Sequence, residues 1–484
     1  MTAAGANGRV PGRLPSGIFS AAMIPDAPVL VGVDPATGRP HPPLPCASPE
    51  DVAAAVADAR KARGRWREAG VEGRAAVLRR GIEKLADPAV AESLAERITS
   101  EMGKPIAKAR AEIATVLARF EPYVERAKAA SAPTRAREGG IEVEVTYRPL
   151  GVAAVIGPWN YPVATPANLL LSSLLMGNTV VFKPSEVTPR TGLALAEILA
   201  DALPRGVLSC VVGGGDVGRT LVEGGVDLVA FTGSVRTGQA IMKAAAEHMT
   251  RLVLELGGKD PMIVLPGADL DRAVAFAVQQ GFANSGQVCV AVERILVHRE
   301  VQGAFTERLV AGVENLTVGP PGDPDTDLGP LATAAQRDHV QALVEDAILR
   351  GARARTPVRF FGPGFFAAPV VLDDVTPEMR ILHEETFGPV VTVESFDEVD
   401  DAVERANATP YGLGASVWGP DDQASAVAER IEAGMVGVNR GISAAAGAPW
   451  VGWKKSGYGY ARSVEGMRQF AVPQSIARNV ASGG

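Results

Sequence analysis

The chain has 484 residues, 46% of them hydrophobic and 21% charged, so it is far too apolar to be a disordered protein. Its 48 basic and 55 acidic residues give a net charge of −7 without a basic stretch, which argues against binding to nucleic acid or to an anionic membrane. No run approaches the roughly 18 apolar residues of a membrane span, and three cysteines cannot build a disulfide framework. We therefore expect a soluble, cytoplasmic, globular protein of several units.

Helices are expected before the first strands. Ser48 can accept hydrogen bonds from the start of a helix, and Pro49, Glu50 and Asp51 suit its first turn. Alanine-rich amphipathic sequence then continues to about residue 130, with a weak break at Pro105. This part of the chain therefore reads as a helical layer.

Residues 141–148 alternate strictly between apolar and polar side chains, which predicts a half-exposed strand in an antiparallel sheet or at a sheet edge. From residue 152 the pattern changes to short, fully apolar runs separated by helical stretches, which is typical of parallel strands covered on both faces. These runs are 152–156, 179–182, 207–212, 228–231 and 252–256. A second set lies at 262–265, 294–297, 370–372, 390–393 and 436–438. We therefore predict an α/β fold whose second α/β domain begins near Gly257.

Three polar turns each follow one of these strands. Residues 213–218 (GGGDVG) fit the G-x-G-x-x-G pattern, whose glycines let backbone N–H groups approach a pyrophosphate, although a plain tight turn explains them equally well. Residues 231–234 (FTGS) also lead from a strand into a helix, and residues 183–186 (KPSE) place a cation and a carboxylate at the end of a strand. Open α/β sheets bind ligands at that edge, so the three turns together favour a dinucleotide.

Cys289 is the strongest candidate nucleophile, because it lies in a small polar stretch just before an apolar strand. Glu255 ends an earlier strand beside a Gly–Gly turn and could act as a general base. Cys46 and Cys210 have no such setting, and we expect both to be buried and inert. None of the five histidines has the spacing of a cysteine protease or a metal site, so no metal is expected.

Six motifs occur in one order and together closely resemble the NAD(P)-dependent aldehyde dehydrogenase superfamily. They are 158–162 (PWNYP), 183–186 (KPSE), 231–234 (FTGS), 255–259 (ELGGK), 286–289 (GQVC) and 385–389 (ETFGP). The likeness extends from about Val33 to Gly459, which is most of the chain. It implies an aldehyde-dehydrogenase-like fold, with a Rossmann-type cofactor domain, an α/β catalytic domain and a small β oligomerisation arm.

The resemblance also implies domain boundaries. The cofactor domain would comprise residues 1–131 and 151–256, and the catalytic domain residues 257–442. Residues 132–150 and 472–484 would form the arm of a homodimer or homotetramer; a surface hairpin packed on its own subunit is the alternative. Residues 443–471 would form a substrate-entrance loop and return to the cofactor domain.

The same resemblance assigns the chemistry. Cys289 would attack an aldehyde as a thiolate, and the Asn160 amide with the Cys289 N–H would stabilise the oxyanion. Hydride transfer to the nicotinamide would leave a thioester, which water activated by Glu255 would hydrolyse to the acid. The implied cofactor contacts are Ile156, Trp159, Lys183, Ser185, Glu186, Gly215, Gly218, Phe231, Gly233, Ser234, Leu256, Glu385 and Phe387. Glu186 would repel a 2′-phosphate and favour NAD, while Lys183 leaves NADP possible.

Five positions depart from the family pattern. Leu169 and Ala461 replace a lysine and a glutamate that many members carry, so Glu255 would exchange protons by another route. Asn168 and Ala283 provide no arginine where relatives specific for succinic semialdehyde often place one, which favours a neutral aliphatic or aromatic aldehyde. The bulk of Trp450 lies in the expected entrance loop and would reshape specificity.

Other readings remain open at this point. One is a succinate-semialdehyde-type dehydrogenase. Another is a CoA-acylating aldehyde dehydrogenase, against which Glu255 argues because that reaction needs no water-activating base. A non-catalytic binding protein that kept the fold is the third.

Overall fold

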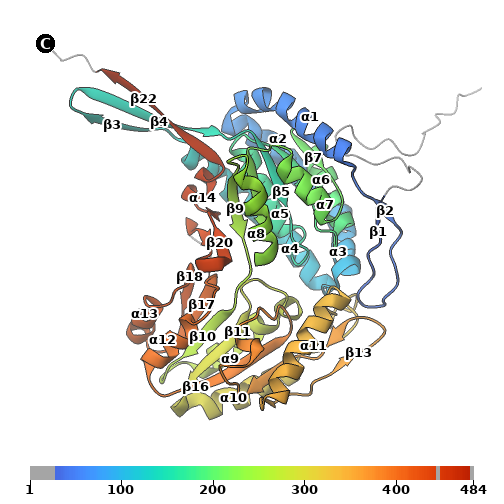
Figure 1. The fold of residues 1–484 in the computed structure, drawn as a ribbon, viewed down its shortest axis with the longest axis vertical. Coiled ribbons are helices and arrows are strands. Elements are labelled where there is room, and N and C mark those ends of the chain that lie inside the picture. Colours follow the sequence, from blue (N-terminus) through green and yellow to red (C-terminus); the bar gives the residue numbers. More distant parts are fainter. Residues whose placement is uncertain (1–27, 443–446, 480–484) are drawn as a thin grey trace, which may run out of the picture.

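The computed structural model describes residues 28–442 and 447–479. The predicted start of the cofactor domain (1–27), part of the entrance loop (443–446) and the end of the arm (480–484) lie outside the described residues. Two large sheets, each flanked by helices, lie one beyond the other along the molecule, and a narrow three-stranded sheet projects from one end (Figure 1). Within the described residues no helix is both long and apolar enough to cross a membrane.

The chain begins with two short strands and four helices. The elements are β1 (Val29–Leu30), β2 (Leu44–Pro45), α1 (Pro49–Glu68), α2 (Gly70–Leu85), α3 (Pro88–Met102) and α4 (Ile106–Ser131). Ser48 caps α1, because its hydroxyl accepts the Asp51 N–H at 3.1 Å while the Asp51 carboxylate accepts the Ser48 N–H at 2.9 Å. The predicted helix start and the break at Pro105 are therefore confirmed.

The first sheet has the strand order β20-β9-β8-β5-β6-β7, parallel except for β20. Its strands are β5 (Val152–Ile156), β6 (Thr179–Lys183), β7 (Leu208–Cys210), β8 (Leu228–Thr232), β9 (Arg251–Glu255) and β20 (Gly457–Tyr458), and its crossover helices are α5 (Ala164–Leu175), α6 (Pro189–Ala200), α7 (Gly215–Glu223) and α8 (Val235–Ala246). Alternate side chains of one strand enter two different cores: Ala153 and Val155 pack towards α4, α5 and α6, whereas Val152 and Ala154 pack towards α1, α7 and α8. The predicted parallel strands, buried on both faces, are confirmed.

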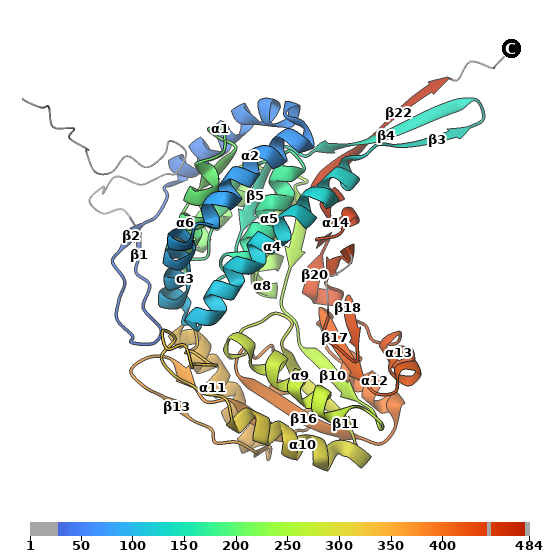
Figure 2. The same cartoon turned by 180° about the vertical axis from the view of Figure 1, so that it is seen from behind.

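The second sheet has the order β12-β15-β16-β11-β10-β17-β18, parallel except for β12. Its strands are β10 (Asp260–Val264), β11 (Val292–His298), β12 (Arg353–Ala354), β15 (Val370–Asp373), β16 (Val390–Phe396), β17 (Gly414–Trp418) and β18 (Met435–Val438), with helices α9 (Leu270–Phe282), α10 (Arg299–Glu314), α11 (Ala334–Leu349), α12 (Val399–Asn407) and α13 (Asp421–Ala428). Residues 256–259 alone separate β9 of the first sheet from β10 of the second (Figures 1 and 2).

The projecting sheet consists of β3 (Thr134–Glu138), β4 (Ile141–Pro149) and β22 (Ala471–Asn479), all antiparallel, with β4 in the middle. The predicted half-exposed strand at 141–148 is therefore confirmed as an antiparallel one. Both views show this sheet standing away from the body of the protein (Figures 1 and 2). The remaining short elements are β13 (Phe360–Phe361), β14 (Phe366–Ala367), β19 (Trp450–Val451), β21 (Tyr460–Ala461) and α14 (Val464–Arg468).

Candidate active site

Glu255 lies at the junction of the two sheets, as the last residue of β9. Its side chain is buried, and one carboxyl oxygen accepts the Thr232 hydroxyl at 3.4 Å. The other oxygen has no hydrogen-bond partner among the described residues. Burial raises the pKa of the Glu255 carboxyl, and the positive charge of Arg462 offsets part of this rise. A buried carboxyl with a raised pKa and a free oxygen is suited to accept a proton.

Cys289 follows a strained loop between α9 and β11. Asn284, Ser285 and Gly286 have φ values of 52°, 57° and 73°, three consecutive left-handed residues. A Cβ atom on Gly286 would lie 1.9 Å from the Gly388 carbonyl oxygen, so only glycine fits there. The Ser285 hydroxyl donates to the Gly329 carbonyl at 2.8 Å. Such strain persists only where the surroundings fix the backbone, as they do around this cysteine.

The ionisation of Cys289 differs from the expected reactive thiolate. Burial and the negative charges of Asp260, Glu255 and Glu385 raise the pKa of its thiol to about 12, and Arg462 offsets only part of this. In the protein alone, the thiol is therefore protonated at neutral pH. An adjacent proton acceptor must remove its proton when it reacts, and Glu255 is the candidate.

The other two cysteines differ from each other. Cys210 is buried, as expected. Cys46 is only half-buried, so the expectation for it was wrong. It precedes α1 on a segment that crosses the end of β7, where the Ala47 N–H donates to the Val212 carbonyl at 2.7 Å. This crossing leaves Cys46 at the edge of the sheet rather than in a core.

Asn160 is bound directly to the Cys289 loop. Its side-chain amide donates to the Gln287 carbonyl at 3.0 Å, and its own carbonyl accepts the Asn284 amide at 3.1 Å. Among the described residues, the Cys289 N–H has no backbone acceptor. One amide proton of Asn160 and the Cys289 N–H thus remain available near the thiol, as an oxyanion site requires.

The predicted cofactor residues gather at the carboxyl edge of the first sheet. The chain leaves β5 towards β6 and β7 and then returns to β8 on its other side, so the strand order reverses between β5 and β8. Ile156 and Phe231 are register partners at the ends of these two strands. Lys183 ends β6 beside them. Crevices at such a reversal are where open α/β sheets bind nucleotides.

The helix N-termini at this edge fit a dinucleotide. Gly214 provides no side-chain cap for α7, and a Cβ on Gly215 would meet no atom within 4 Å, so the backbone there faces open space. Ser234 caps α8 by accepting the Thr237 N–H at 3.3 Å. The N-terminus of α7, which no side chain caps among the described residues, suits a pyrophosphate, and the start of α8 lies at the same edge of the sheet.

Some of the predicted cofactor residues also pack against neighbouring parts of the protein. A Cβ on Gly218 would lie 3.5 Å from the Lys183 side chain, and one on Gly233 would lie 2.4 Å from the Phe231 ring. The Ser185 hydroxyl accepts the Val187 N–H at 3.2 Å and stabilises its own turn. These contacts show what else Gly218, Gly233 and Ser185 touch, and their proposed role beside a cofactor stays a prediction.

Lys183 and Glu186 interact with each other. The Lys183 ammonium is buried, donates to the Pro184 carbonyl at 3.0 Å and lies 3.5 Å from the Glu186 carboxylate, which is 53% exposed. This arrangement leaves the carboxylate able to accept hydrogen bonds from a bound ligand.

A loop of the second sheet completes the site. The Glu385 carboxylate accepts the Gly258 N–H at 3.1 Å, and burial with the nearby Glu293 charge raises its pKa to about 8. The Phe387 ring packs edge-on against Trp159 with their centroids 5.4 Å apart. Leu256 packs against Gly238 of α8. Residues from both sheets therefore meet around the 256–259 linker.

Two arginines near the reaction centre were not identified from the sequence. The Arg462 guanidinium lies 4.0 Å from the centre of the Trp450 ring, with a strained φ of 75°. Arg119 of α4 lines a small pocket with Ala164 and Asn168, and burial, together with the nearby positive charge of Arg462, lowers the pKa of Arg119. Neither arginine pairs with a carboxylate among the described residues. The only sequence signal was the position of Arg462 beside the unusual Ala461.

Among the residues noted as departures, Leu169, Asn168 and Ala461 are buried, whereas Ala283 and Trp450 are half-buried. Leu169 lies in the core between α4 and α5, and Asn168 accepts the Tyr123 hydroxyl at 2.6 Å.

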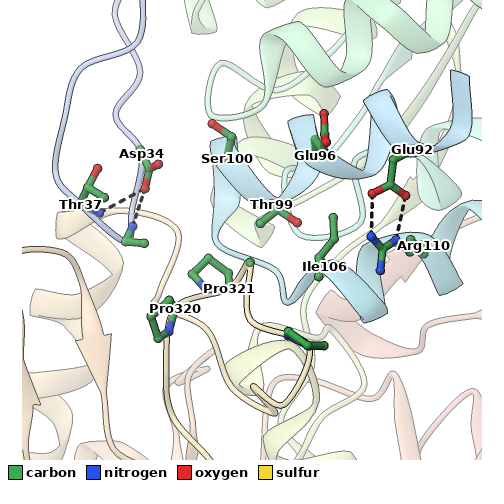
Figure 3. Close-up of a pocket in the computed structure, with 13 residues that line it drawn as sticks. Asp34, Thr37, Glu92, Glu96, Thr99, Ser100, Ile106, Arg110, Pro320 and Pro321 are labelled. Carbon is green, nitrogen blue, oxygen red and sulfur yellow. Dashed lines mark hydrogen bonds and ion pairs between the residues drawn. The ribbon is translucent and has the colours of Figure 1, made fainter. Parts of the chain in front are cut away.

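A separate surface pocket between α3 and the loop at 320–324 contains the Glu92–Arg110 ion pair and none of the predicted site residues (Figure 3).

Comparisons with known proteins identify the family of this chain. The model of the aldehyde dehydrogenase family matches residues 26–476. A succinate-semialdehyde dehydrogenase (NADP+) of Deinococcus radiodurans is 38% identical over 442 residues, which cover 90% of this chain and 92% of that protein. The structure of lactaldehyde dehydrogenase from Escherichia coli is similar with a TM-score of 0.91 and 33% identity, covering 96% of this chain and 99% of that one. Betaine aldehyde dehydrogenase of Staphylococcus aureus in complex with NAD+ gives a TM-score of 0.88 at 32% identity, covering 94% of this chain and 92% of that one.

The expected fold and family are thus confirmed by whole-chain matches in both sequence and structure. The chain belongs to the aldehyde dehydrogenase family and is an oxidoreductase.

Proposed function

We propose that this protein oxidises an aldehyde to its carboxylic acid with NAD or NADP, through a thioester on Cys289 that Glu255 helps to hydrolyse. The observation that carries this proposal is the arrangement of side chains at the junction of the two sheets. Glu255 is buried with an unpartnered oxygen, and its charge affects the Cys289 thiol, whose loop is hydrogen-bonded to the Asn160 amide. A nucleophile, a base and an oxyanion donor are the three groups that this reaction needs.

Cys289, Asn160 and Glu255 have distinct roles in this reaction. The Cys289 sulfur forms a bond to the aldehyde carbon, and its proton passes to Glu255. The Asn160 amide and the Cys289 N–H hold the resulting oxyanion. The bound nicotinamide supplies the hydride acceptor. Glu255 releases the thiol proton to solvent after hydride transfer. It then takes a proton from water, whose oxygen attacks the thioester carbon. When the C–S bond breaks and the acid leaves, this proton passes to the Cys289 sulfur and restores the thiol.

The cofactor preference follows from Glu186. Its half-exposed carboxylate would accept bonds from ribose hydroxyls and repel a 2′-phosphate, so we expect NAD to be preferred and NADP tolerated through Lys183. The relatives support both cofactors, since one is named for NADP and another was solved with NAD+.

The substrate class has two candidates. Asn168 and Ala283 offer no cation, which supports a neutral aliphatic or aromatic aldehyde. Arg119 and Arg462 favour the second candidate, an aldehyde with a distal carboxylate, because both guanidinium groups lack an acidic partner among the described residues and one affects the reactive thiol. The Deinococcus radiodurans relative, named for succinate semialdehyde, supports the same candidate.

The domain boundaries and the assembly are also proposals. The two sheets support a cofactor domain that ends near residue 256 and a catalytic domain that follows it. The projecting sheet supports a homodimer or homotetramer, since Ile141 on it is 44% exposed. Light scattering of the purified protein, with and without residues 472–484, would measure the assembly.

The decisive experiment measures reduced-cofactor formation with NAD or NADP and a panel of aliphatic, aromatic and ω-carboxylate aldehydes. Turnover should vanish in Cys289→Ala. Glu255→Gln should form reduced cofactor slowly and stop at no more than about one equivalent per subunit, because the thiol loses its proton acceptor and the thioester is no longer hydrolysed. A full steady rate in Glu255→Gln, or an acyl-CoA product when CoA is added, would refute the hydrolytic mechanism.

The same panel distinguishes the substrate classes. Arg462→Met should raise KM for ω-carboxylate aldehydes at least tenfold while changing that for neutral ones little. If Arg462→Met changes KM equally for both classes of aldehyde, neutral aldehydes become the favoured substrates.

A further inference from the structure

A buried ion pair lies directly behind the Asn160 turn. Lys104, in the loop between α3 and α4, binds Glu112 of α4, and each side chain is only 1% exposed. Burying a charged pair is costly, and removing one partner leaves an uncompensated charge. Such a pair specifies position more than it adds stability, so the groups that it touches indicate its purpose.

Lys104 holds the peptide group of Asn160. Its ammonium donates to the Asn160 carbonyl at 2.8 Å and lies 3.8 Å from the centre of the Tyr161 ring. Together with the Asn284 amide, it gives this carbonyl two donors. The orientation of the Asn160 backbone is therefore fixed from one side by Lys104 and from the other by the Cys289 loop.

Glu112 holds the next residues of the same segment. Its second carboxyl oxygen accepts the Val163 and Ala164 N–H groups, both at 2.9 Å. Helix α5 has no side-chain cap of its own at Val163. Glu112 thus supplies that cap from a neighbouring helix, where its negative charge also favours the positive end of α5.

The Lys104 loop also contacts the segment that supports Cys289. Gly103 lies against Gly329 and Pro330: a Cβ on Gly329 would be 1.9 Å from the Gly103 carbonyl oxygen. The Gly329 carbonyl in turn accepts the Ser285 hydroxyl. On the outer side of this junction, Ile106 lies beside Pro321, whose carbonyl accepts the Ile106 N–H at 2.8 Å (Figure 3).

We propose that Lys104 and Glu112 are positioning residues that hold the Asn160 amide in register with the Cys289 thiol. This inference rests on the proposed role of Asn160 as the oxyanion donor. The pair fixes residues 160–164 at both ends, so its loss lets the amide move away from the oxyanion without removing it.

The test is a double-mutant cycle on kcat/KM for the best aldehyde. The variant Lys104→Met/Glu112→Gln removes both charges, leaves an acceptor for the α5 N–H groups and avoids an unpaired buried charge. Removing an oxyanion donor costs about 10²–10³-fold, so Asn160→Ala should lose that much and the Lys104/Glu112 variant about 10- to 100-fold. Added to Asn160→Ala, the same two changes should cost less than about threefold, because no amide is left to position.

A matched control exists in the second sheet. Lys259 and Glu293 form another buried pair, which holds Thr386 through a 2.9 Å bond from Lys259 and does not contact Asn160. Lys259→Met/Glu293→Gln should therefore combine additively with Asn160→Ala. Melting temperature, measured for every variant, reports folding independently of the chemistry, and NAD affinity reports any change that Lys259→Met/Glu293→Gln makes to the loop of Glu385 and Phe387.

Two results would overturn the proposal. One is a folded Lys104→Met/Glu112→Gln variant with kcat/KM within twofold of the parent. The other is an equal fold-loss in kcat/KM when Lys104 and Glu112 are changed in the parent and when they are changed in Asn160→Ala. That result would assign the pair a purely structural role. Should the double variant not fold, Glu112→Gln alone is tested in the same cycle. An Asn160→Ala variant with full activity would instead refute the oxyanion role in the proposed function.

Discussion

The raised pKa of Cys289 predicts slow, strongly pH-dependent alkylation of the cofactor-free protein. With a pKa of about 12, roughly one thiol in ten thousand is ionised at pH 8, against about one in ten for a thiol with its ordinary pKa of 9.0. A more basic thiolate is also a better nucleophile, which recovers about 16- to 32-fold for this difference. The net expectation is alkylation about 30- to 60-fold slower than that of an exposed cysteine in an unfolded peptide.

The assay is iodoacetamide labelling between pH 7 and pH 10, with each cysteine quantified separately by peptide mass spectrometry. The rate at Cys289 should rise about tenfold per pH unit without a plateau. At pH 9, Glu255→Gln should react faster, because removing a negative charge lowers the thiol pKa. Arg462→Met should react more slowly, because it removes a positive charge that lowers this pKa.

Two outcomes would refute this reasoning. A plateau below pH 9 would show a thiol already ionised by an arrangement that burial and these charges do not explain. Slower labelling of Glu255→Gln would show that Glu255 acts on the thiol as a proton acceptor even before substrate binds, rather than as a repelling charge.

Three further variants test other parts of the structure. Glu186→Ser should shift the ratio of kcat/KM for NAD over NADP towards NADP by at least several-fold, and an unchanged ratio would remove Glu186 from cofactor selection. Gly286→Ala should abolish turnover and lower the melting temperature, because its Cβ would meet a carbonyl oxygen at 1.9 Å; an active, stable variant would contradict the strained loop. Leu169→Lys should not raise the deacylation rate and should cost several kcal/mol of stability, roughly the penalty of an unpaired buried charge, as measured by denaturant unfolding; faster deacylation would revive the proton path of other members.

The parallel strands and the turns after them could be predicted because their signals are local. The run at 152–156 is apolar at every position, and it forms β5, buried on both faces. The GGGDVG turn leads into α7 for the same local reason, since its glycines permit a tight turn before a helix. Motifs that lie far apart in the sequence come together at the carboxyl edge of the sheet, because its parallel strands all end there.

The support of the site could not be predicted in this way. Lys104 reaches the carbonyl of a residue 56 positions further along the chain, and its local sequence showed only a weak helix break. Arg462 acquires its importance from the pairing of β21 with β19, which brings its chain segment beside Trp450. Cys46 is only half-buried because the segment that contains it crosses the end of β7. Such a crossing depends on three-dimensional packing and cannot be predicted from a local sequence pattern.

Because a linker of only four residues connects β9 to β10, the catalytic rate depends on how the two halves of the protein pack against each other. Glu255 belongs to one sheet, and the loop before Cys289 leads into the other, so no single folded half contains the complete chemistry. A displacement of about 1 Å between them would cost on the order of a hundredfold in rate while leaving both cores intact. Mild denaturant should therefore abolish activity before it changes the far-ultraviolet circular dichroism, and the gap between the two transitions measures how firmly the halves hold together.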